Sequence, residues 1–234
     1  MELSKRLKKV ADMVSQGKRI ADIGCDHAYV SIYLIKEGTA SKVIALDINK
    51  GPLSRANENI KKYGFSQLIE TRLSDGAKRL QPGEVDTLLI AGMGGALMVK
   101  ILTESKEVVD SCEELILQPQ SEIFLVRKLL EQIGFQIVDE DMIIEDKKYY
   151  VMIKARKEKV NQGNNTKEIY YRYGELLLKR RNPVLKEFLK EGLRGNQELI
   201  DRLKLGDSIN GKKRIEEIRK EIEYIKEGLD YYEM

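Results

Sequence analysis

Short apolar runs alternate with amphipathic stretches of helical period through the first 157 residues of the chain. The apolar runs typical of buried strands cover residues 19–23, 42–46, 69–73, 85–91 and 114–117. The helical stretches that follow them cover residues 28–36, 52–63, 96–102 and 122–133. An opening helix places on one face the apolar side chains Leu3, Leu7, Val10, Ala11 and Val14. Alternation of this kind predicts an α/β fold, with a parallel sheet and helices on both faces.

The last part of this region departs from the alternation. Residues 135–144 and 149–155 are two strand-like runs, joined directly around Glu145-Asp146-Lys147 without an intervening helix. This arrangement predicts a hairpin that adds an antiparallel edge to the sheet. A ligand is then expected at the carboxyl ends of the parallel strands, where the strand order reverses. A dinucleotide-dependent oxidoreductase shares most of this pattern but less naturally ends in a hairpin.

Beyond residue 157 the pattern becomes helical. Residues 161–165 form a polar linker, and a helical stripe from Ile169 is interrupted at Pro183 before it resumes. An a/d seam then runs through Ile215, Ile218, Ile222, Ile225 and Leu229. Gly206-Asp207-Ser208 and Gly211 supply a turn, so we expect a coiled-coil-like antiparallel helical hairpin. We therefore divide the chain into a first domain, residues 1–157, and a helical tail, residues 158–234.

Composition narrows the class of protein. The 234 residues suffice for one domain and a smaller appendage. Charged residues make up 34% and the net charge is +3, which allows a nucleic-acid partner without requiring one. Cys25 and Cys112 lie far apart in sequence, so we expect neither a disulfide framework nor a metal site. The chain has no apolar signal segment and no run of membrane-spanning length, so we expect a cytoplasmic protein without a membrane partner.

The segment Asp22-Ile23-Gly24-Cys25-Asp26-His27-Ala28 follows the first predicted strand and opens a helix. A glycine there lets the backbone approach a ligand closely, and the helix N-terminus offers free N–H donors. A dinucleotide fingerprint would need more glycines, and Asp26 stands where a phosphate would least tolerate a carboxylate. S-adenosylmethionine (SAM) has no phosphate and carries two cationic groups, so the loop favours SAM. A simple tight turn is the plainer alternative.

Two acidic positions follow the next strands. Asp47, which precedes Ile48, ends the second strand, where a carboxylate accepts hydrogen bonds from ribose hydroxyls. Taken alone it is as often a helix cap, but beside the Gly24 loop it indicates ribose binding. Ser74-Asp75-Gly76 follows the third strand, where the adenine edge of SAM would lie, with a plain turn as the alternative.

The fourth and fifth strands are followed by segments that suit a substrate. Ala91-Gly92-Met93-Gly94-Gly95 lets a ligand approach the backbone amides, although it is also typical of a tight turn. Gln118-Pro119-Gln120 is a candidate for the rim of the site. The sequence lacks an Asn-Pro-Pro-Tyr tetrad, by which many enzymes that methylate exocyclic amino groups hold their target.

His27, the single histidine, and Tyr29 lie at the start of the helix after the Gly24 loop. A lone histidine is usually structural. Its position beside the expected ligand favours a direct contact instead, and Tyr29 could stack on a base.

These segments together resemble the bacterial tRNA (adenine-22-N1)-methyltransferases of the TrmK type. The similarity rests on Asp22 to Tyr29, Ala45-Leu46-Asp47-Ile48, Leu73-Ser74-Asp75-Gly76, Ile90 to Gly95 and Leu117-Gln118-Pro119-Gln120, and with the helical tail it covers essentially the whole chain. The Asp22–Tyr29 string is specific, because SAM enzymes in general carry a glycine where Asp26 stands. The resemblance implies a class I methyltransferase fold with a Rossmann-like sheet, SAM as methyl donor, and a tRNA D-arm adenine, position 22, as acceptor.

Roles follow from the residues and the resemblance together. The catalytic candidates are Asp26, His27 and Tyr29. The cofactor candidates are Asp22, Gly24, Asp47, Ile48, Ser74, Asp75, Gly76, Ala91, Gly92 and Met93. The substrate candidates are Gly94 and Gln118, and in the tail Lys179, Arg180, Arg181, Lys212, Lys213 and Arg214. The first basic stretch continues through Lys186, Lys190 and Arg194. The alternative for the tail is a solvated face balanced by Glu187, Glu191, Glu216 and Glu217.

Two questions stay open at the level of sequence. Asp26 could stabilise the cationic ring of the methylated adenine, or it could bind the ammonium of SAM. The whole chain could be a SAM methyltransferase acting on another RNA base or on a small molecule, or a non-catalytic SAM- or RNA-binding protein. We expect a monomer with tRNA as its partner.

Overall fold

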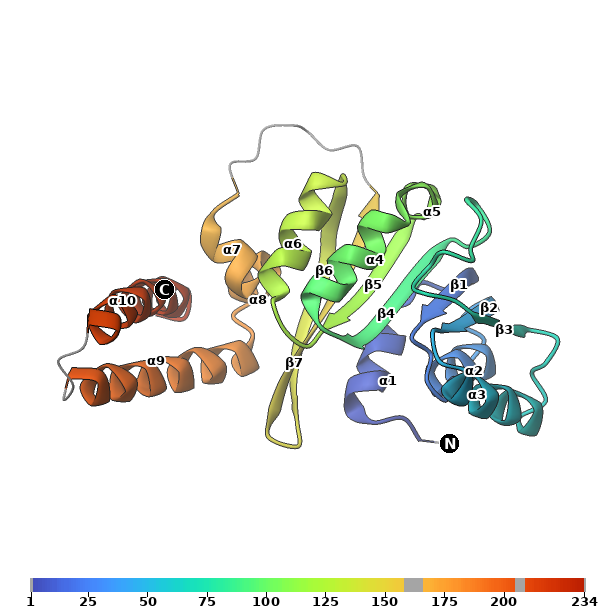
Figure 1. The fold of residues 1–234 in the computed structure, drawn as a ribbon, viewed down its shortest axis with the longest axis horizontal. Coiled ribbons are helices and arrows are strands. Elements are labelled where there is room, and N and C mark those ends of the chain that lie inside the picture. Colours follow the sequence, from blue (N-terminus) through green and yellow to red (C-terminus); the bar gives the residue numbers. More distant parts are fainter. Residues whose placement is uncertain (1, 158–165, 205–208, 234) are drawn as a thin grey trace. The chain divides into compact units, whose positions relative to one another are not determined.

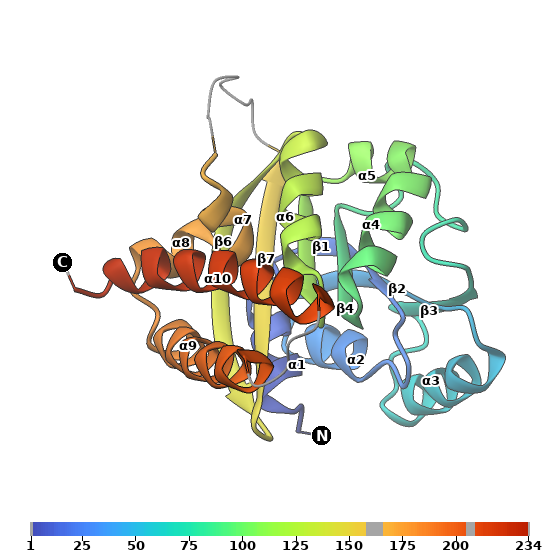
Figure 2. The same cartoon turned by 60° about the vertical axis from the view of Figure 1, so that its left-hand side comes forward.

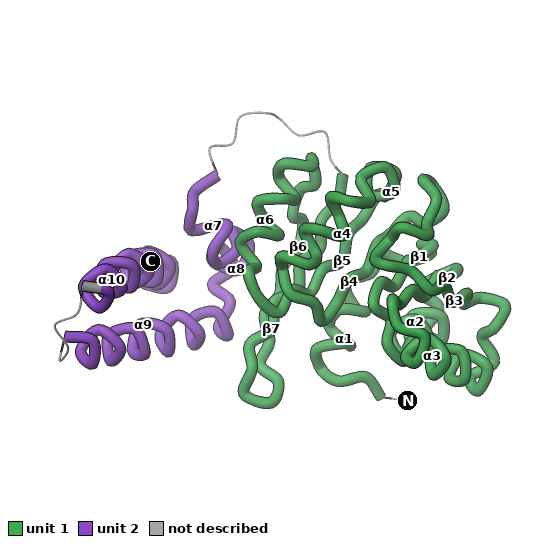
Figure 3. Tube along the Cα trace, viewed as in Figure 1, with its two compact units in different colours: residues 1–164 green, residues 165–234 purple. Residues whose placement is uncertain are grey.

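The computed structural model describes residues 2–157, 166–204 and 209–233. The chain divides into two compact units, residues 1–164 and residues 165–234 (Figure 3). The predicted domain boundary at residue 158, the predicted linker 161–165 and the predicted turn Gly206-Asp207-Ser208 lie outside the described residues.

Among the described residues of unit 1, seven strands form one sheet of order β3-β2-β1-β4-β5-β7-β6 (Figure 1). They are β1 (Lys18–Ile23), β2 (Ala40–Asp47), β3 (Ile69–Leu73), β4 (Thr87–Met93), β5 (Glu114–Pro119), β6 (Phe135–Glu145) and β7 (Lys148–Lys157). Strands β1 to β5 pair in parallel, whereas β6 and β7 form an antiparallel hairpin that pairs with β5. The predicted α/β class and its closing hairpin are confirmed.

Helices cover the sheet and explain the apolar runs. They are α1 (Lys5–Asp12), α2 (Tyr29–Lys36), α3 (Lys50–Lys62), α4 (Gly95–Glu104), α5 (Lys106–Ser111) and α6 (Ile123–Gln132). Side chains of α1, α2 and α3 share a core with Leu89 of β4 and Ile116 of β5, while α4 packs with α6 and α5. Because both faces are covered, the central strands are apolar throughout rather than alternating. The sequence pattern did not predict α5, a short helix of six residues.

Unit 2 consists of helices α7 (Glu168–Tyr173), α8 (Glu175–Lys179), α9 (Pro183–Lys204) and α10 (Ile209–Asp230) over its described residues. The predicted stripe from Ile169 breaks at Gly174, whose φ is +87°. Pro183 begins α9, and the side chain of Asn182 caps it by accepting the N–H groups of Val184 and Leu185 at 2.9 and 3.1 Å. The prediction that Gly211 lies in a turn is wrong, because α10 already begins at Ile209.

Helices α9 and α10 lie side by side and antiparallel (Figure 2). A Cβ at Gly192 would lie 3.4 Å from Ile225 Cδ1, and one at Gly228 would lie 3.1 Å from Leu189 Cδ1, so the two glycines face side chains of the opposite helix. Ile222 and Ile225 are buried along this seam. The predicted helical hairpin is confirmed, whereas coiled-coil geometry stays a prediction. None of the helices in the described ranges combines the length and the apolar character that crossing a membrane requires.

Candidate cofactor and substrate site

The strand order reverses between β1 and β4, the place at which open parallel sheets bind ligands. The residue after β1 and the last residue of β4 meet there, because β4 extends to Met93 and so includes the Ala91-Gly92-Met93 segment that the sequence placed after it. A Cβ at Gly24 would lie only 2.2 Å from Met93 Cε, so the absence of a side chain at Gly24 is what allows this approach. The structure thus brings together two of the predicted cofactor segments.

The loop after β1 has an unusual backbone. Gly24 has a φ of +74°, and Asp26 and Ala28 have φ values of +50° and +59°, in a region that residues other than glycine rarely adopt. The N–H groups of Gly24 and Cys25 both donate to Leu46 O of β2, at 2.8 and 2.9 Å. Strained backbone of this kind persists only where the surroundings fix it, and it concentrates at functional sites.

Asp47 joins this loop to the end of β2. Its Oδ2 atom accepts the Asp26 N–H at 3.3 Å, and its Oδ1 atom accepts the Asn49 N–H at 2.8 Å. The helix-cap alternative does not hold, because the capping residue of α3 is Asn49. A carboxylate oxygen can accept further hydrogen bonds, so Asp47 retains capacity for hydroxyl groups. Beside it Ile48 is 60% exposed, a large apolar side chain presented to a ligand or to solvent.

Asp22 lies inside the fold at the end of β1. The Ser31 hydroxyl of α2 donates to its Oδ2 atom at 2.6 Å. Burial away from water raises the pKa of Asp22 to about 6, while the Ser31 hydrogen bond acts in the opposite direction. Asp22 therefore links β1 to α2 beneath the Gly24 loop.

The segment after β3 is tied to the same region. The Ser74 N–H donates to Asp47 O at 2.9 Å, and the Ser74 hydroxyl donates to Gly76 O at 2.9 Å. The Asp75 carboxylate accepts from Lys78 Nζ at 2.5 Å, which lowers the pKa of Asp75. Ser74 and Gly76 thus form a turn that presents Asp75 at the surface.

The glycine-rich segment after β4 packs backbone against backbone on the loop after β5. The Gly95 N–H donates to Ser121 O at 3.0 Å, and a Cβ at Gly95 would lie 2.5 Å from that oxygen. A Cβ at Gly94 would lie 3.2 Å from Ser121 Oγ. The Gln120 N–H donates to Met93 O at 2.8 Å. These contacts explain part of the glycine content without a ligand.

Gln118 does not lie at the rim, where the sequence placed it. It belongs to β5 and is fully buried. Its Oε1 atom accepts the Gly92 N–H at 3.1 Å and a hydrogen bond from Arg6 Nη1 at 2.6 Å. The side chain therefore contacts Gly92 and Arg6 and is not exposed to a large substrate.

The three catalytic candidates form one cluster at the start of α2. His27 Nε2 lies 3.5 Å from Asp26 Oδ1, and the His27 and Tyr29 rings are 5.6 Å apart. The Asp26 side chain is 67% exposed and Tyr29 is also exposed, so both can meet a ligand. Asn59 Nδ2 fixes the loop by donating to His27 O at 3.0 Å.

Sequence reasoning missed Arg6 and Asn59. Arg6 belongs to a stretch of basic residues in the first helix, which resembles an ordinary solvated face. Its Cζ lies 5.4 Å from the centroid of the Tyr150 ring of β7. No local pattern could have found this contact, because it joins residues more than a hundred positions apart.

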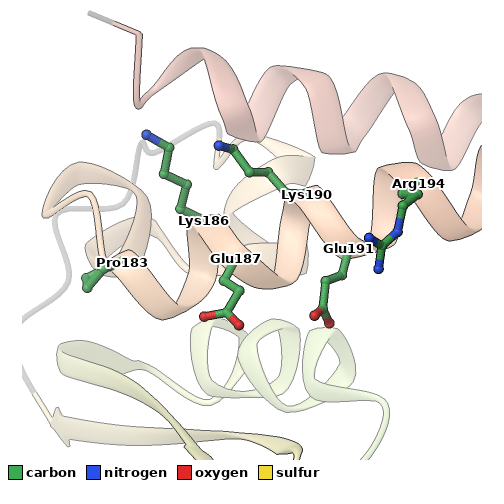
Figure 4. A pocket seen from close by; sticks show the side chains of 6 residues that line it. All are labelled: Pro183, Lys186, Glu187, Lys190, Glu191 and Arg194. Carbon is green, nitrogen blue, oxygen red and sulfur yellow. The ribbon is translucent and has the colours of Figure 1, made fainter.

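The tail candidates lie in unit 2 and mix basic with acidic side chains. Lys179 pairs with Glu175 at 2.7 Å and Arg214 with Glu217 at 2.7 Å. Figure 4 shows a hollow on α9, with Lys186 and Lys190 pointing to one side of the helix and Glu187 and Glu191 to the other. The basic stretches are thus partly balanced, as the solvated-face alternative expects.

Within residues 2–157, 166–204 and 209–233, no group of three or more His, Cys, Asp and Glu side chains could hold a metal ion.

Comparison with known proteins agrees with this geometry. The model of a methyltransferase-domain family matches residues 3–153, which is more than half of the chain, so the chain belongs to this class of methyltransferases. The tRNA (adenine(22)-N(1))-methyltransferase of Bacillus subtilis is 32% identical over 235 aligned positions, covering 99% of this chain and 98% of the relative. Within the class, the chain therefore belongs to the tRNA (adenine(22)-N(1))-methyltransferase family.

Solved structures of relatives agree over the same extent. The crystal structure of the B. subtilis m1A22 tRNA methyltransferase TrmK is 31% identical, with a TM-score of 0.86, and the match covers 97% of this chain and 99% of that one. The Streptococcus pneumoniae protein Sp1610, a putative tRNA (m1A22) methyltransferase solved in complex with S-adenosyl-L-methionine, is 31% identical, with a TM-score of 0.81 and coverage of 97% and 100%. The likeness includes both units of the chain.

Proposed function

We propose that the chain transfers a methyl group from SAM to N1 of adenine 22 in the D-arm of tRNA. The observation that carries this proposal is the similarity to the B. subtilis enzyme over 99% of the chain, tail included. The generic methyltransferase match reaches only residue 153 and leaves the substrate open.

The residues at the switch point fit SAM. The loop after β1 approaches the end of β4 at Gly24, where a Cβ would lie 2.2 Å from the terminal methyl group of Met93. Asp47 retains acceptor capacity for ribose hydroxyls, and the exposed Ile48 offers an apolar surface for adenine. Asp22, Asp26 and Asp47 make the region acidic, which suits a cationic cofactor and disfavours the phosphates of a dinucleotide. SAM, when bound, supplies a methyl group activated by a positively charged sulfur.

The acceptor needs little covalent help from the protein. Adenine N1 carries an in-plane lone pair, so a new N–C bond forms as the S–C bond breaks, and the positive charge passes from sulfur to the adenine ring. The work of the chain is then to align the base and to exclude water. N1 lies on the Watson–Crick edge, so the base has to be unpaired or extruded from the stack.

Asp26 is the candidate for charge stabilisation. Its exposed carboxylate stands beside His27 at the mouth of the Gly24 loop. A carboxylate there would stabilise the charge that develops on adenine. The competing role is to bind the SAM ammonium.

Asp26→Asn keeps the shape of the side chain and removes its charge, so in single-turnover measurements with saturating SAM we expect methyl transfer to slow by about tenfold or more. An unchanged rate would show that the charge plays no part in the chemical step.

The remaining assignments concern the whole chain. We assign residues 1–157 to SAM binding and catalysis, and residues 158–234 to gripping tRNA through the two basic stretches. Because tRNA is the substrate, we place the enzyme in the cytoplasm. We predict that the chain is a monomer, and light scattering of the purified chain measures its molar mass in solution.

A methylation assay with defined transcripts tests the function. The full chain is incubated with SAM and a tRNA transcript carrying adenine 22, and in parallel with the same transcript carrying guanine there. We expect one N1-methyladenine, mapped at position 22, and none in the guanine transcript. Methylation at another position would favour specificity for a different RNA base, and SAM binding without methylation of any tRNA would favour a non-catalytic protein.

A further inference from the structure

Arg6, in the first turn of α1, reaches the carboxyl ends of β4 and β5. Its Nη1 atom donates to Gln118 Oε1 at 2.6 Å, and the same oxygen accepts the Gly92 N–H at 3.1 Å. Gln118 Nε2 in turn donates to Pro119 O at 3.1 Å. Because the Gln118 side chain is fully buried and bonded at both ends, it holds the guanidinium in a fixed place.

The helix that carries Arg6 is itself anchored to the β6–β7 hairpin. The Lys5 N–H donates to Glu145 Oε1 at 2.6 Å, and Lys9 pairs with Asp141 at 2.6 Å. On the hairpin side, the centroid of the Tyr150 ring lies 5.4 Å from Arg6 Cζ. The guanidinium is therefore held between the end of β5 and the hairpin, which extends beyond the paired part of β5 (Figure 1).

Arg6 is half-buried, yet it is not paired with an acidic side chain among the residues that the structure describes. Over the ranges that the structure describes, no carboxylate lies within ion-pair distance of its guanidinium, and Gln118 is the side chain that accepts a hydrogen bond from it. Partly buried cations normally pair with an acid. A guanidinium has five N–H donors in a planar fork that matches the oxygens of a carboxylate or phosphate. Most of these donors remain for an external anion.

The position of Arg6 separates it from the ribose end of the cofactor site. Asp47 ends β2, whereas Arg6 is bonded to β5, and the order β2-β1-β4-β5 puts three strand spacings between them. At about 4.8 Å per spacing this is about 14 Å across the edge of the sheet. Arg6 thus lies on the side of the Gly92 segment that is remote from Asp47, and with the SAM ribose at Asp47 an acceptor could approach the methyl group from this side.

We propose that Arg6 binds a backbone phosphate of the tRNA next to the target adenine and so positions that base over the cofactor. This inference rests on the proposed function and adds to it a substrate-binding residue in the catalytic unit, separate from the basic stretches of the tail. Tyr150 and Gln118 orient the fork, and Gly92 borders it, since a Cβ at Gly92 would be in van der Waals contact with Arg6 Nη1 at 3.4 Å.

The test compares two affinities of the full-length chain, measured without turnover. Binding of tRNA is measured over a series of salt concentrations in the presence of S-adenosylhomocysteine, and binding of S-adenosylhomocysteine alone is measured by calorimetry. For Arg6→Ala we expect tRNA affinity to fall about tenfold, as for the loss of one hydrogen-bonded charge. The slope of log affinity against log salt should decrease by about 0.7–0.9, as for one phosphate contact. S-adenosylhomocysteine affinity should stay within about twofold.

Three further variants separate this role from a structural one. Lys8→Ala on the same helix removes an exposed cation that pairs with Asp12, and it should leave both affinities unchanged. Arg6→Lys keeps the charge, so the salt slope should stay near that of the wild type although affinity falls. Gln118→Glu places an internal carboxylate against Arg6, and tRNA affinity should fall with the fold intact.

Two results would overturn the proposal. A loss of S-adenosylhomocysteine affinity in Arg6→Ala, with tRNA affinity retained, would assign the guanidinium to the carboxylate of the cofactor. An unchanged slope of log tRNA affinity against log salt in Arg6→Ala would show that Arg6 only holds the Gln118 side chain in place and does not bind a phosphate. Either result leaves methylation of adenine 22 by the wild-type chain untouched, so failure of this proposal is distinguishable from failure of the proposed function.

Discussion

At the scale of single residues, Asp47 is the side chain on which the cofactor site converges. Its two carboxylate oxygens accept the N–H groups of Asp26, in the loop after β1, and of Asn49, directly after β2. Its backbone carbonyl accepts the Ser74 N–H. Asp47 therefore links the ends of β1, β2 and β3, and we propose that it also binds the ribose of SAM.

Asp47→Ala should weaken SAM binding by roughly 1–3 kcal/mol, because ribose hydroxyls would lose their acceptor. Calorimetric titration with SAM measures this, and circular dichroism verifies that the sheet is intact. Asp75→Ala is a useful comparison, since Asp75 lies at the surface and its expected contact is with the adenine edge alone. An Asp47→Ala protein that is folded and binds SAM as the wild type does would remove Asp47 from the site.

Asp22 makes stability depend on pH in a direction opposite to that of most carboxylates. Its pKa of about 6 in the folded chain exceeds the ordinary value of 3.8, so its contribution is fully present below about pH 4 and is lost as pH rises through 6. Relative to Asp22→Asn, which does not titrate, the wild type should lose on the order of 3 kcal/mol of unfolding free energy between pH 4 and pH 7. Urea denaturation of both proteins without SAM measures the difference. Parallel stability curves would contradict the buried, poorly solvated state of Asp22.

The places of residues in the fold were predictable where they follow a strand directly. Gly24 comes directly after β1 and Asp47 ends β2, as the sequence pattern predicts, whereas their roles in binding SAM stay proposals. Arg6 and the burial of Gln118 were not predictable, because both depend on which strand lies next to which helix. Glycines after β4 were ambiguous for another reason: Gly95 is required by a close backbone contact, and the sequence does not distinguish this from a ligand contact.

At the scale of elements, long apolar runs predicted the sheet well, since strands covered on both faces leave a clear signal. The hairpin β6–β7 was equally clear, because no helical stretch separates its strands. Short helices such as α5, and the break at Gly174, were missed or misplaced because a few residues carry too little periodicity. The antiparallel pairing of α9 and α10 followed from the seam of isoleucines.

That seam should carry much of the stability of the tail. Ile225 is almost fully buried and faces Gly192 of α9. Because Gly192 has no side chain, it cannot fill the cavity that a smaller residue at position 225 would leave. Ile225→Ala should lower the stability of the helical hairpin by roughly 2–4 kcal/mol. Glu223→Ala, an exposed neighbour on the same helix, should change it by less than about 0.5 kcal/mol. Equal effects on thermal unfolding of the two variants would contradict the seam.

At the scale of the whole molecule, the candidate cofactor residues lie within unit 1, which has its own sheet and core. A chain truncated after residue 157 should therefore keep SAM affinity within about twofold, while tRNA affinity falls by at least about tenfold because the phosphates bound by the tail are released. Filter binding with tRNA and calorimetry with SAM compare the two chains. Undiminished tRNA affinity of a folded truncation would refute the gripping role of the tail.

The basic stretch of α10 offers a finer version of this test. Lys212, Lys213 and Arg214 are exposed. Their joint replacement by glutamine should flatten the salt dependence of tRNA binding in the full chain by about 0.7–0.9 for each phosphate that is no longer neutralised. Glutamine at Glu216 and Glu217, which removes the balancing acids instead, should leave the slope unchanged or steeper.

The most direct test of the central claim is the methylation state of adenine 22 in cellular tRNA. Mass spectrometry of tRNA from a strain lacking this gene is compared with the same strain carrying the wild-type gene or the Asp26→Asn gene. We predict that N1-methyladenine at position 22 is absent from the deletion strain, restored by the wild-type gene, and strongly reduced with Asp26→Asn. Methylation of adenine 22 that persists in the deletion strain, or that the wild-type gene fails to restore, would contradict the proposed function.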